Sequence, residues 1–473
     1  MLASLAVLKS SSRLGLLRRS PSFGYLFLAT AGSSFGTYLA AVALTLQVYD
    51  LTGSGTWVAA LLIADFLPIV VIGFLLGPLV DRLSRRRLMI ASDLVRFGVF
   101  AALPFVDGVG GLIALAAVSG IATGFFLPAA NAAIPNLVPE EELVNANSLV
   151  VTVETLSWMI GPVVAALMVT AWGPTVPYAV NAVTFLVSAG FVAAISERSL
   201  RSGDSLTRGH WRDVGDGLRL VFTTSPLRTV LVVWNVALVG SAAVNVAEVV
   251  FAKETLDAGD VGFGALVAAS GIGLTFGSFL SAPALGKVGL RRTYVSSFLL
   301  MGVGWGAAAL SGSIWLAVAF VVGGAAGNGS VIVCNRLLVQ RGAPDRYRGR
   351  ALATIMSSNY AVLGLAMAAA GVLTDQFGAR AVWAGAGVVY LLAAAVAFAL
   401  TRWLPVAVED EQSAFDASSE SAVAGLAYGN GNGQGHEPAA DDRGGERAGG
   451  LERIAILLEE IEARREAEAR RPS

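Results

Sequence analysis

Long apolar runs constrain the fold of this chain more than any other feature of its sequence. We identify twelve, each of roughly 20 residues, the length that an α-helix needs to cross about 30 Å of hydrocarbon. Only 14% of the residues are charged and 55% are hydrophobic, whereas a globular protein in water covers its surface with charged side chains. The sequence therefore predicts an all-α membrane protein with twelve transmembrane helices and excludes a soluble enzyme. The predicted helices cover residues 23–48, 56–78, 88–106, 111–136, 147–171, 175–195, 227–251, 261–283, 293–311, 314–340, 351–375 and 380–403.

Basic residues divide unequally between the two sets of alternate loops. One set, which includes the residues before Phe23, carries 21 Lys and Arg residues, whereas the other holds only Lys253 and Arg380. Short loops rich in Lys and Arg stay in the cytoplasm. An even number of spans puts both termini on one side, so we predict a multi-pass protein of the cell membrane with cytoplasmic N- and C-termini.

A basic turn follows the second apolar run and reads GPLVDRLSRRR from residue 77 to 87. Its spacing resembles the loop signature of the major facilitator superfamily, with Ser84 at a position that is usually Gly. The resemblance implies a gating loop made of Gly77, Asp81, Arg82, Arg86 and Arg87. It also implies that Asp81 locks two halves of a transporter together by meeting the N-terminal end of the eleventh helix, near residues 351–354, where the helix dipole favours a carboxylate.

An internal repeat appears at an offset of 205 residues. Its matches fall at loops and helix ends: Pro78 with Pro283, Arg82 with Lys287, Arg86 and Arg87 with Arg291 and Arg292, Pro139 with Pro344, and Gly173 with Gly378. The repeat predicts two six-helix halves, as in transporters that alternate access around a central site. The predicted organisation is a cytoplasmic lead-in at 1–22, a six-helix bundle at 23–195, a cytoplasmic linker at 196–226, a second bundle at 227–403, a disordered tail at 404–449 and an amphipathic helix at 450–473.

Two further segments narrow the resemblance. Residues 125–149 read FFLPAANAAIPNLVPEEELVNANSL, and residues 341–350 read RGAPDRYRGR. They resemble the connections after the fourth and tenth helices in the drug:proton antiporter branch that includes enterobactin exporters and macrolide efflux proteins. The resemblance implies export by alternating access and leaves the substrate open.

The carboxyl groups inside predicted helices include Asp65, Glu154 and Glu248. A charge at the bilayer centre costs about 2.5–3.5 kcal/mol on insertion scales, so each group is a functional candidate. A proton-coupled antiporter needs a carboxyl at this depth that takes up a proton on one side and releases it when substrate or solvent arrives. The alternative is that each carboxyl pairs with a neighbouring polar group.

Asn131 and Arg336 correspond by the repeat offset, and the resemblance implies that both of their helices face the cavity. Asn131 is suited to orienting a neutral or cationic substrate. Arg336 either extends to the cytoplasm or binds an anionic group. Asp93 and Arg96 are three residues apart on one predicted helix, close enough to form a structural ion pair.

Other chemistry has little support in the sequence. Both histidines, His210 and His436, lie outside the apolar runs, and Cys334 is the only cysteine, so we expect no metal site and no cofactor. A net charge of −1 gives no reason to expect a nucleic-acid partner. We predict a protein that exports an amphipathic, drug-like small molecule across the lipid bilayer in exchange for protons. We expect it to be a monomer and to have no enzymatic activity. The alternatives are a siderophore or metabolite exporter with the same mechanism, and a non-transporting membrane scaffold or sensor.

Overall fold

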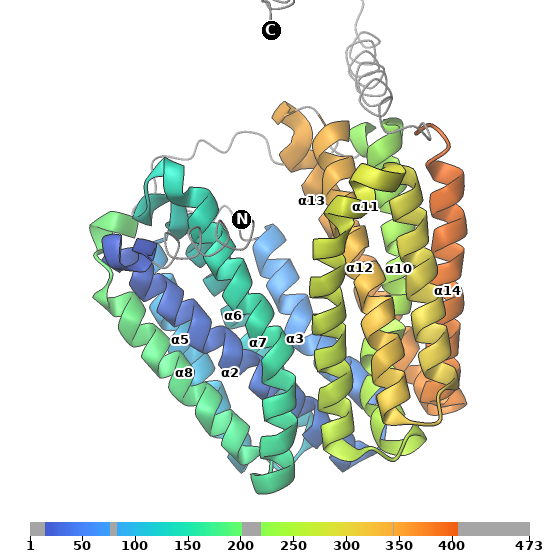
Figure 1. The fold of residues 1–473 in the computed structure, drawn as a ribbon. Coiled ribbons are helices and arrows are strands. Elements are labelled where there is room, and N and C mark those ends of the chain that lie inside the picture. The colour runs from blue at the N-terminus through green and yellow to red at the C-terminus, as the bar shows by residue number, and fades with distance from the viewer. Residues whose placement is uncertain (1–14, 76–82, 201–218, 344, 405–473) are drawn as a thin grey trace, which may run out of the picture. The chain divides into compact units, whose positions relative to one another are not determined.

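The computed structural model describes residues 15–75, 83–200, 219–343 and 345–404, all within one compact unit (Figure 1). The predicted tail, most of the predicted linker, and Gly77, Asp81 and Arg82 lie outside these residues. No strand occurs among the described residues.

The long helices are α2 (Pro21–Thr52), α3 (Gly55–Leu75), α5 (Arg85–Ala102), α6 (Val109–Leu137), α7 (Leu143–Trp172), α8 (Thr175–Ala194), α10 (Ser225–Val250), α11 (Gly259–Leu310), α12 (Ile314–Gly342), α13 (Asp345–Phe377) and α14 (Ala379–Leu400). The short ones are the 3₁₀-helices η1 (Leu103–Phe105), η2 (Glu140–Glu142) and η3 (Glu197–Leu200) and the π-helix η4 (Phe251–Thr255).

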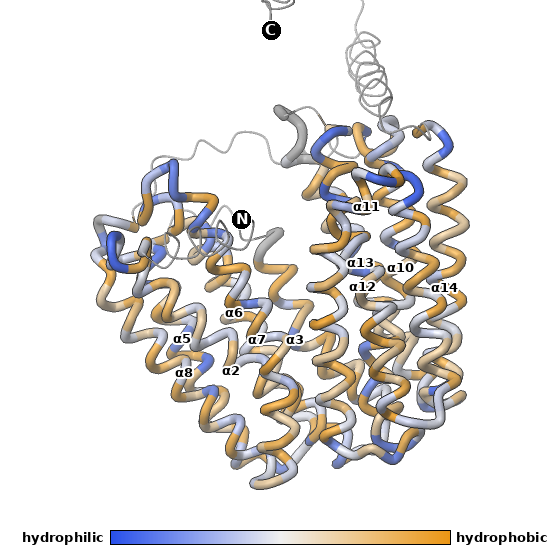
Figure 2. The backbone as a smooth tube through the Cα atoms, viewed as in Figure 1, coloured by the Kyte–Doolittle hydropathy of each residue, from blue (hydrophilic) through white to orange (hydrophobic). Residues whose placement is uncertain are grey.

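Eleven helices in the described part of the chain are long and apolar enough to cross a membrane, so the predicted count of twelve is not confirmed. The difference lies in α11, whose 52 residues contain two predicted spans, 261–283 and 293–311. Gly289 interrupts this helix with φ of 80° and ψ of 169°, a conformation that favours glycine. Figure 2 shows hydrophobic residues along most of each helix and hydrophilic residues gathered near the helix ends. Large apolar side chains are exposed on the outside, as lipid allows, among them Phe279, Val303 and Leu365.

The helices pack in two groups that follow the sequence repeat. Helices α2 to α8 pack on one another and form the N-terminal half, and α10 to α14 form the C-terminal half. Gly173 and Gly378, a pair matched by the offset of 205, both have positive φ, 76° and 79°, at the turn between two helices. The halves meet mainly where α3 contacts α13 and where α7 contacts α11. The offset maps α3 onto the first part of α11 and α7 onto α13, so the two contacts are equivalent under exchange of the halves.

The two ends of the helices differ in charge. We call the end with Arg85–Arg87, Arg291 and Arg341 the basic end. The end where α2 meets α3 and α13 meets α14 is the opposite end. Successive helices run in alternating directions, so the start of α3 and the finish of α13 lie together at the opposite end.

Candidate functional site

A cavity of about 360 Å³ lies between the two halves, and we call it the inter-half cavity. Its lining comes from α3, α6 and α13, always from the part of the helix that is nearer the basic end. Phe66 and Tyr360 approach each other across it, with ring centroids 5.5 Å apart. The remaining apolar lining includes Ile69, Val70, Leu127 and Met356, and the polar lining is Asn131, Ser357 and the Tyr360 hydroxyl.

Of the two residues predicted to face the cavity, only Asn131 lines it. Asn131 is exposed and lines the inter-half cavity from α6, as the resemblance implied. Arg336 on α12 is exposed and is not among the lining residues. The described lining of the inter-half cavity therefore contains no cation or carboxylate, which suits a neutral ligand better than an ion.

Asp65 faces a second cavity, of about 110 Å³, inside the N-terminal half; we call it the Asp65 cavity. It lies among α2, α3, α5 and α6, and Ile69 lines both cavities. Four hydroxyl-bearing side chains share the lining with Asp65: Thr37, Thr45, Ser119 and Thr123. No hydrogen bond or ion pair from another described residue reaches the Asp65 carboxylate, so the predicted pairing with a polar neighbour is not seen there.

The other two predicted carboxyls lie apart from both cavities. Glu154 on α7 is partly buried and close enough to Tyr38 of α2 for an electrostatic interaction. Glu248 on α10 is only 5% exposed, and its Oε1 has no hydrogen-bond partner. The structure therefore does not bring the three carboxyls into one site.

Arg86 and Arg87, the described members of the predicted gating loop, each make a polar contact with another residue of the N-terminal half. Arg86 donates to the carbonyl of Ala193, and Arg87 Nε lies 3.9 Å from Glu197 Oε1. Ser84 caps α5 by accepting from the Arg87 amide, and it donates to Glu197 at 3.0 Å. A glycine at position 84 would lose both bonds, which gives a physical reason for the departure from the superfamily pattern.

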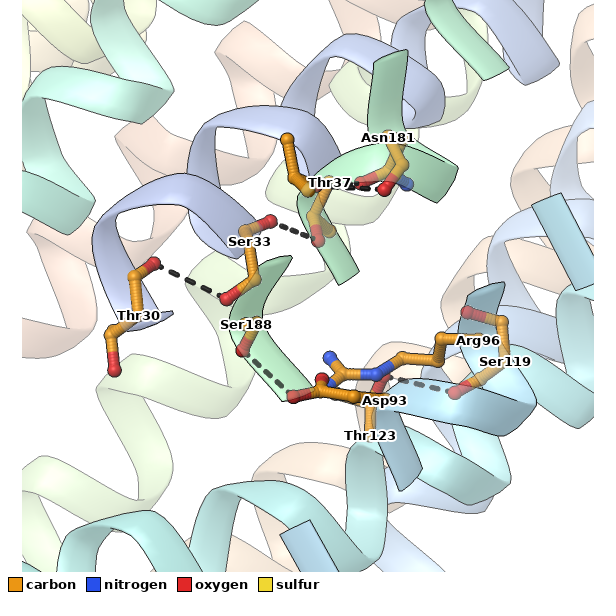
Figure 3. A network of polar contacts seen from close by, with 10 residues as sticks. Thr30, Ser33, Thr37, Asp93, Arg96, Ser119, Thr123, Asn181 and Ser188 are labelled. Carbon is orange, nitrogen blue, oxygen red and sulfur yellow. Dashed lines mark hydrogen bonds and ion pairs between the residues drawn. The ribbon is translucent and has the colours of Figure 1, made fainter. Parts of the chain in front are cut away.

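Asp93 and Arg96 form the predicted ion pair, with 2.5 Å between Oδ1 and Nη2 (Figure 3). Both side chains are buried, and Ser188 of α8 donates to the other Asp93 oxygen at 2.7 Å. The Arg96 guanidinium lies 4.4 Å from the ring centre of Phe126 and 4.3 Å from that of Phe185. The pair joins α5 to α6 through Phe126 and to α8 through Phe185 and Ser188. These contacts support a structural role for the pair.

A polar contact between the halves closes the opposite end, and sequence reasoning missed it. Asp375, near the finish of α13, accepts four hydrogen bonds from the start of α3. The donors are the Ser54 hydroxyl at 2.7 Å, the Gly55 amide at 2.6 Å, and the Thr56 amide and hydroxyl at 3.2 and 2.6 Å. A carboxylate from one half thus caps a helix of the other, where the helix dipole favours negative charge.

Lys253 adds a second link between the halves at the same end. Its ammonium group pairs with Asp50 of α2 and, at 2.8 Å, with Asp260 of α11. Below these contacts the helices pack tightly: a Cβ placed on Gly371 of α13 would lie 2.8 Å from the Thr56 Cα. We call Asp375, Lys253 and their partners the opposite-end gate. The halves are therefore joined at one end and enclose a cavity toward the other.

Several relatives of this chain are efflux proteins. A family model described as a transmembrane secretion effector matches residues 12–427. The chain is 28% identical over 403 residues to the multidrug efflux pump Tap of Mycolicibacterium fortuitum. The matched region covers 81% of this chain and 97% of Tap. It is also 28% identical over 200 residues to macrolide efflux protein A of Streptococcus pyogenes, across 41% of this chain and 49% of that protein.

Solved structures agree on the fold. The crystal structure of a bacterial homologue of the iron transporter ferroportin in an inward-facing state superposes with a TM-score of 0.65, covering 81% of this chain and 99% of the other at 15% identity. At 15% sequence identity, this structural similarity is evidence for the fold alone. With a family model that matches most of its length, the chain belongs to the transmembrane secretion effector family of major facilitator superfamily transporters.

Proposed function

We propose that this protein exports a neutral, amphipathic, drug-like small molecule in exchange for protons. The observation that carries the proposal is the inter-half cavity: its walls are aromatic and aliphatic, and Asn131, Ser357 and Tyr360 supply the polar groups. Such a lining recognises a large apolar body bearing a few hydrogen-bonding groups. Two relatives of this chain, the multidrug efflux pump Tap and macrolide efflux protein A, support the same class of substrate.

Alternating access follows from two arrangements of the halves. In the present one the opposite-end gate is closed, and the inter-half cavity lies toward the basic end. The positive-inside rule supports a cytoplasmic basic end and cytoplasmic termini, so this arrangement faces inward. Export requires the gate to part after substrate binds, while the helices near the basic end come together. On this proposal α11 crosses the membrane twice, on either side of Gly289, which gives twelve spans.

Proton exchange supplies the driving force in this proposal, and Asp65, Glu154 and Glu248 are its candidate carriers. Protonation removes the charge whose burial is costly, so a carboxyl at this depth couples its proton to a change of surroundings. We also propose that the protein works as a monomer in the lipid bilayer, without cofactor, nucleic acid or catalytic activity. The second candidate is export of a siderophore or other metabolite by the same machinery.

The test is an accumulation screen in cells with and without the chain. A panel of macrolides and other amphipathic drugs, together with siderophores, should show lower accumulation of at least one compound when the chain is present. Collapse of the proton gradient should abolish the difference. The variant Phe66→Ala, in the inter-half cavity, should reduce efflux or change its selectivity, whereas Phe279→Ala, on the lipid-exposed side at 77% exposure, should not.

Two results would contradict the proposal. Unchanged accumulation of every compound would exclude export of this class, and efflux that survives collapse of the gradient would exclude proton coupling. A scaffold or sensor whose working part is the tail would lose its function when residues 405–473 are deleted. Transport that persists after this deletion favours the exporter.

A further inference from the structure

Two arginines of the C-terminal half converge on one aromatic ring at the basic end. The guanidinium carbon of Arg291, two residues after the break in α11, lies 5.0 Å from the ring centre of Phe398 on α14. The guanidinium carbon of Arg402, just beyond the end of α14, lies 5.7 Å from the same ring centre. An aromatic ring attracts each cation but carries no net charge. The ring therefore holds two like charges near one another and neutralises neither.

Neither arginine forms an ion pair with a carboxylate in the described part of the chain. The ion pairs there use other cations, namely Arg19, Arg87, Arg96 and Lys253. Nor does either guanidinium donate a hydrogen bond to another described residue; their contact there is the shared ring. A guanidinium has five N–H donors, so both side chains can still bind an acceptor.

The N-terminal half shows an equivalent arginine that its own half satisfies. The offset of 205 maps Arg291 onto Arg86 and Phe398 onto Ala193. Arg86 donates to the Ala193 carbonyl, so part of its hydrogen-bonding capacity is used within the protein. In the C-terminal half the large Phe398 side chain replaces that of alanine, and Arg291 lies over its ring. The same position thus presents a cation with unused donors in one half only.

An exposed apolar surface continues from the two arginines along α11 and α14, which pack side by side (Figure 1). A Cβ placed on Gly302 of α11 would lie 2.6 Å from the Leu391 side chain of α14, so the helices are in close contact there. Between this contact and the basic end, Leu299 is 45% exposed and Phe398 is 49% exposed. Positive charge at a helix end beside exposed apolar side chains matches a ligand with an anionic head and a hydrocarbon body.

We propose that Arg291 and Arg402, held by Phe398, bind the headgroup phosphate of an anionic phospholipid whose acyl chains lie along α11 and α14. Arginine forms paired, charge-assisted hydrogen bonds with phosphate oxygens, and basic sites beside transmembrane helices bind anionic lipid headgroups. A zwitterionic lipid brings its own ammonium group and would leave both arginine charges unbalanced. The site lies on α11 and α14, away from the inter-half cavity, so lipid binding there is separate from the proposed export.

Lipid binding is measured by native mass spectrometry on the purified, delipidated full-length protein in detergent. Phosphatidylglycerol and phosphatidylcholine with the same acyl chains are titrated separately, and we expect phosphatidylglycerol to bind saturably and several-fold more tightly. Arg291→Gln and Arg402→Gln should each weaken phosphatidylglycerol binding about fivefold, the effect of one basic residue near an anionic lipid surface. Both should leave phosphatidylcholine binding unchanged. Arg292→Gln is the matched control, because it removes a neighbouring exposed charge that does not lie over Phe398, and it should bind like the wild type.

A second variant separates loss of the site from loss of the fold. Phe398→Leu keeps an apolar side chain but removes the ring that both guanidinium groups contact, so it should also weaken phosphatidylglycerol binding. Each variant should keep the wild-type melting temperature in detergent without lipid. A variant that melts early is replaced by the other members of the set, which report on the same contact.

Three results would overturn the proposal. The first is equal binding of the two lipids, or a loss in Arg292→Gln as large as in Arg291→Gln, since either would reflect only the general charge of the basic end. The second is displacement of bound phosphatidylglycerol by inorganic phosphate, which would identify a soluble anion as the ligand. The third concerns residues 409–411, which are Glu, Asp and Glu and lie outside the described residues. Phosphatidylglycerol binding that appears only after Glu409→Gln, Asp410→Asn and Glu411→Gln are combined would mean that these carboxylates occupy the arginines instead.

Discussion

Asp93 and Arg96 show how this bundle accommodates two charges among apolar helices. Each charge is satisfied by more than its partner: Ser188 donates to Asp93, and two aromatic rings flank the Arg96 guanidinium. Both side chains are buried, so neither regains water if the other is lost. Removing one member of a buried pair leaves an uncompensated charge, which is a larger loss than the pair itself contributes.

We therefore predict that Asp93→Asn destabilises the protein by about 3–5 kcal/mol. The purified protein should show a clearly lower apparent melting temperature and a lower yield of folded material. Ser188→Ala is the control, because it removes one hydrogen bond to a charged group and should cost only about 1.5–3 kcal/mol. A melting temperature for Asp93→Asn equal to that of the wild type would show that Arg96 finds another partner.

A second prediction concerns coupling through Asp65 and Glu154. If either carboxyl carries the proton, Asp65→Asn or Glu154→Gln should still allow substrate exchange, because exchange needs no net proton movement. The same variant should fail to accumulate substrate against a gradient in proteoliposomes with an imposed pH difference. Equal loss of both activities, or of neither, would assign these carboxyls to packing or substrate binding. Asp107→Asn should retain both activities.

Individual residues were predictable where a local pattern existed. The spacing of three between Asp93 and Arg96 predicts their pair, and the family resemblance predicts that Asn131 lies on a helix that faces the cavity. Arg336 does not line that cavity, because no residue of α12 is among its lining residues. Spacing along a chain also gives no sign that Ser84 takes the place of glycine to cap a helix and bind Glu197.

Helix ends carry the main features that the sequence did not reveal. Asp375 lies more than 300 residues from Ser54 and Thr56, and each of them, taken singly, looks like a solvated residue at the end of an apolar run. Only the packing of α13 on α3 brings them together. α11 is the converse case: hydropathy predicts two spans with a loop between them, yet a single residue with non-helical dihedral angles, Gly289, separates the two helical stretches.

Opening of the gate can be tested through Asp375. We predict that Asp375→Asn favours parting of the halves at the opposite end, because the amide lacks the charge that the start of α3 favours and has one acceptor oxygen instead of two. With Cys334 replaced by Ser, an Ala59→Cys reporter at the interface should react with an impermeant thiol reagent several-fold faster when Asp375→Asn is also present. Asp257→Asn, an exposed loop residue at the same end, should leave the rate unchanged. Equal rates in all three proteins would mean that Asp375 does not hold the gate.

The whole molecule is arranged as two halves of similar fold and unlike chemistry. Gly173 and Gly378 repeat the same backbone turn, and the two contacts between the halves are related by the same offset. The charged groups do not repeat: Asp375 corresponds to Thr170, and Glu154 to Asn359. The architecture was therefore predictable from hydropathy and the repeat, whereas the cavities and the gate depend on side chains that differ between the halves.

The orientation of the whole molecule follows from its charges and can be measured by labelling. After Cys334→Ser, Leu83→Cys at the basic end should resist an impermeant thiol reagent in intact cells, and Asp107→Cys at the opposite end should react. Both positions are exposed, so the difference reports sidedness. Permeabilised cells should label both. The reverse pattern in intact cells would invert the topology, and with it the direction in which the inter-half cavity opens.

The four hydrogen bonds to Asp375 also bear on how fast such a protein can cycle. Every group in that contact lies at a helix end, where water can replace its partner as soon as the halves separate. Exchange with water reduces each bond to a net contribution of about 0.5–1.5 kcal/mol, or about 1.5–3 kcal/mol where a charge takes part. A contact made of buried apolar side chains alone would have no such compensation. Because water replaces the hydrogen bonds of Asp375 when the halves part, the joined and parted arrangements can remain close in free energy. Repeated turnover requires this similarity.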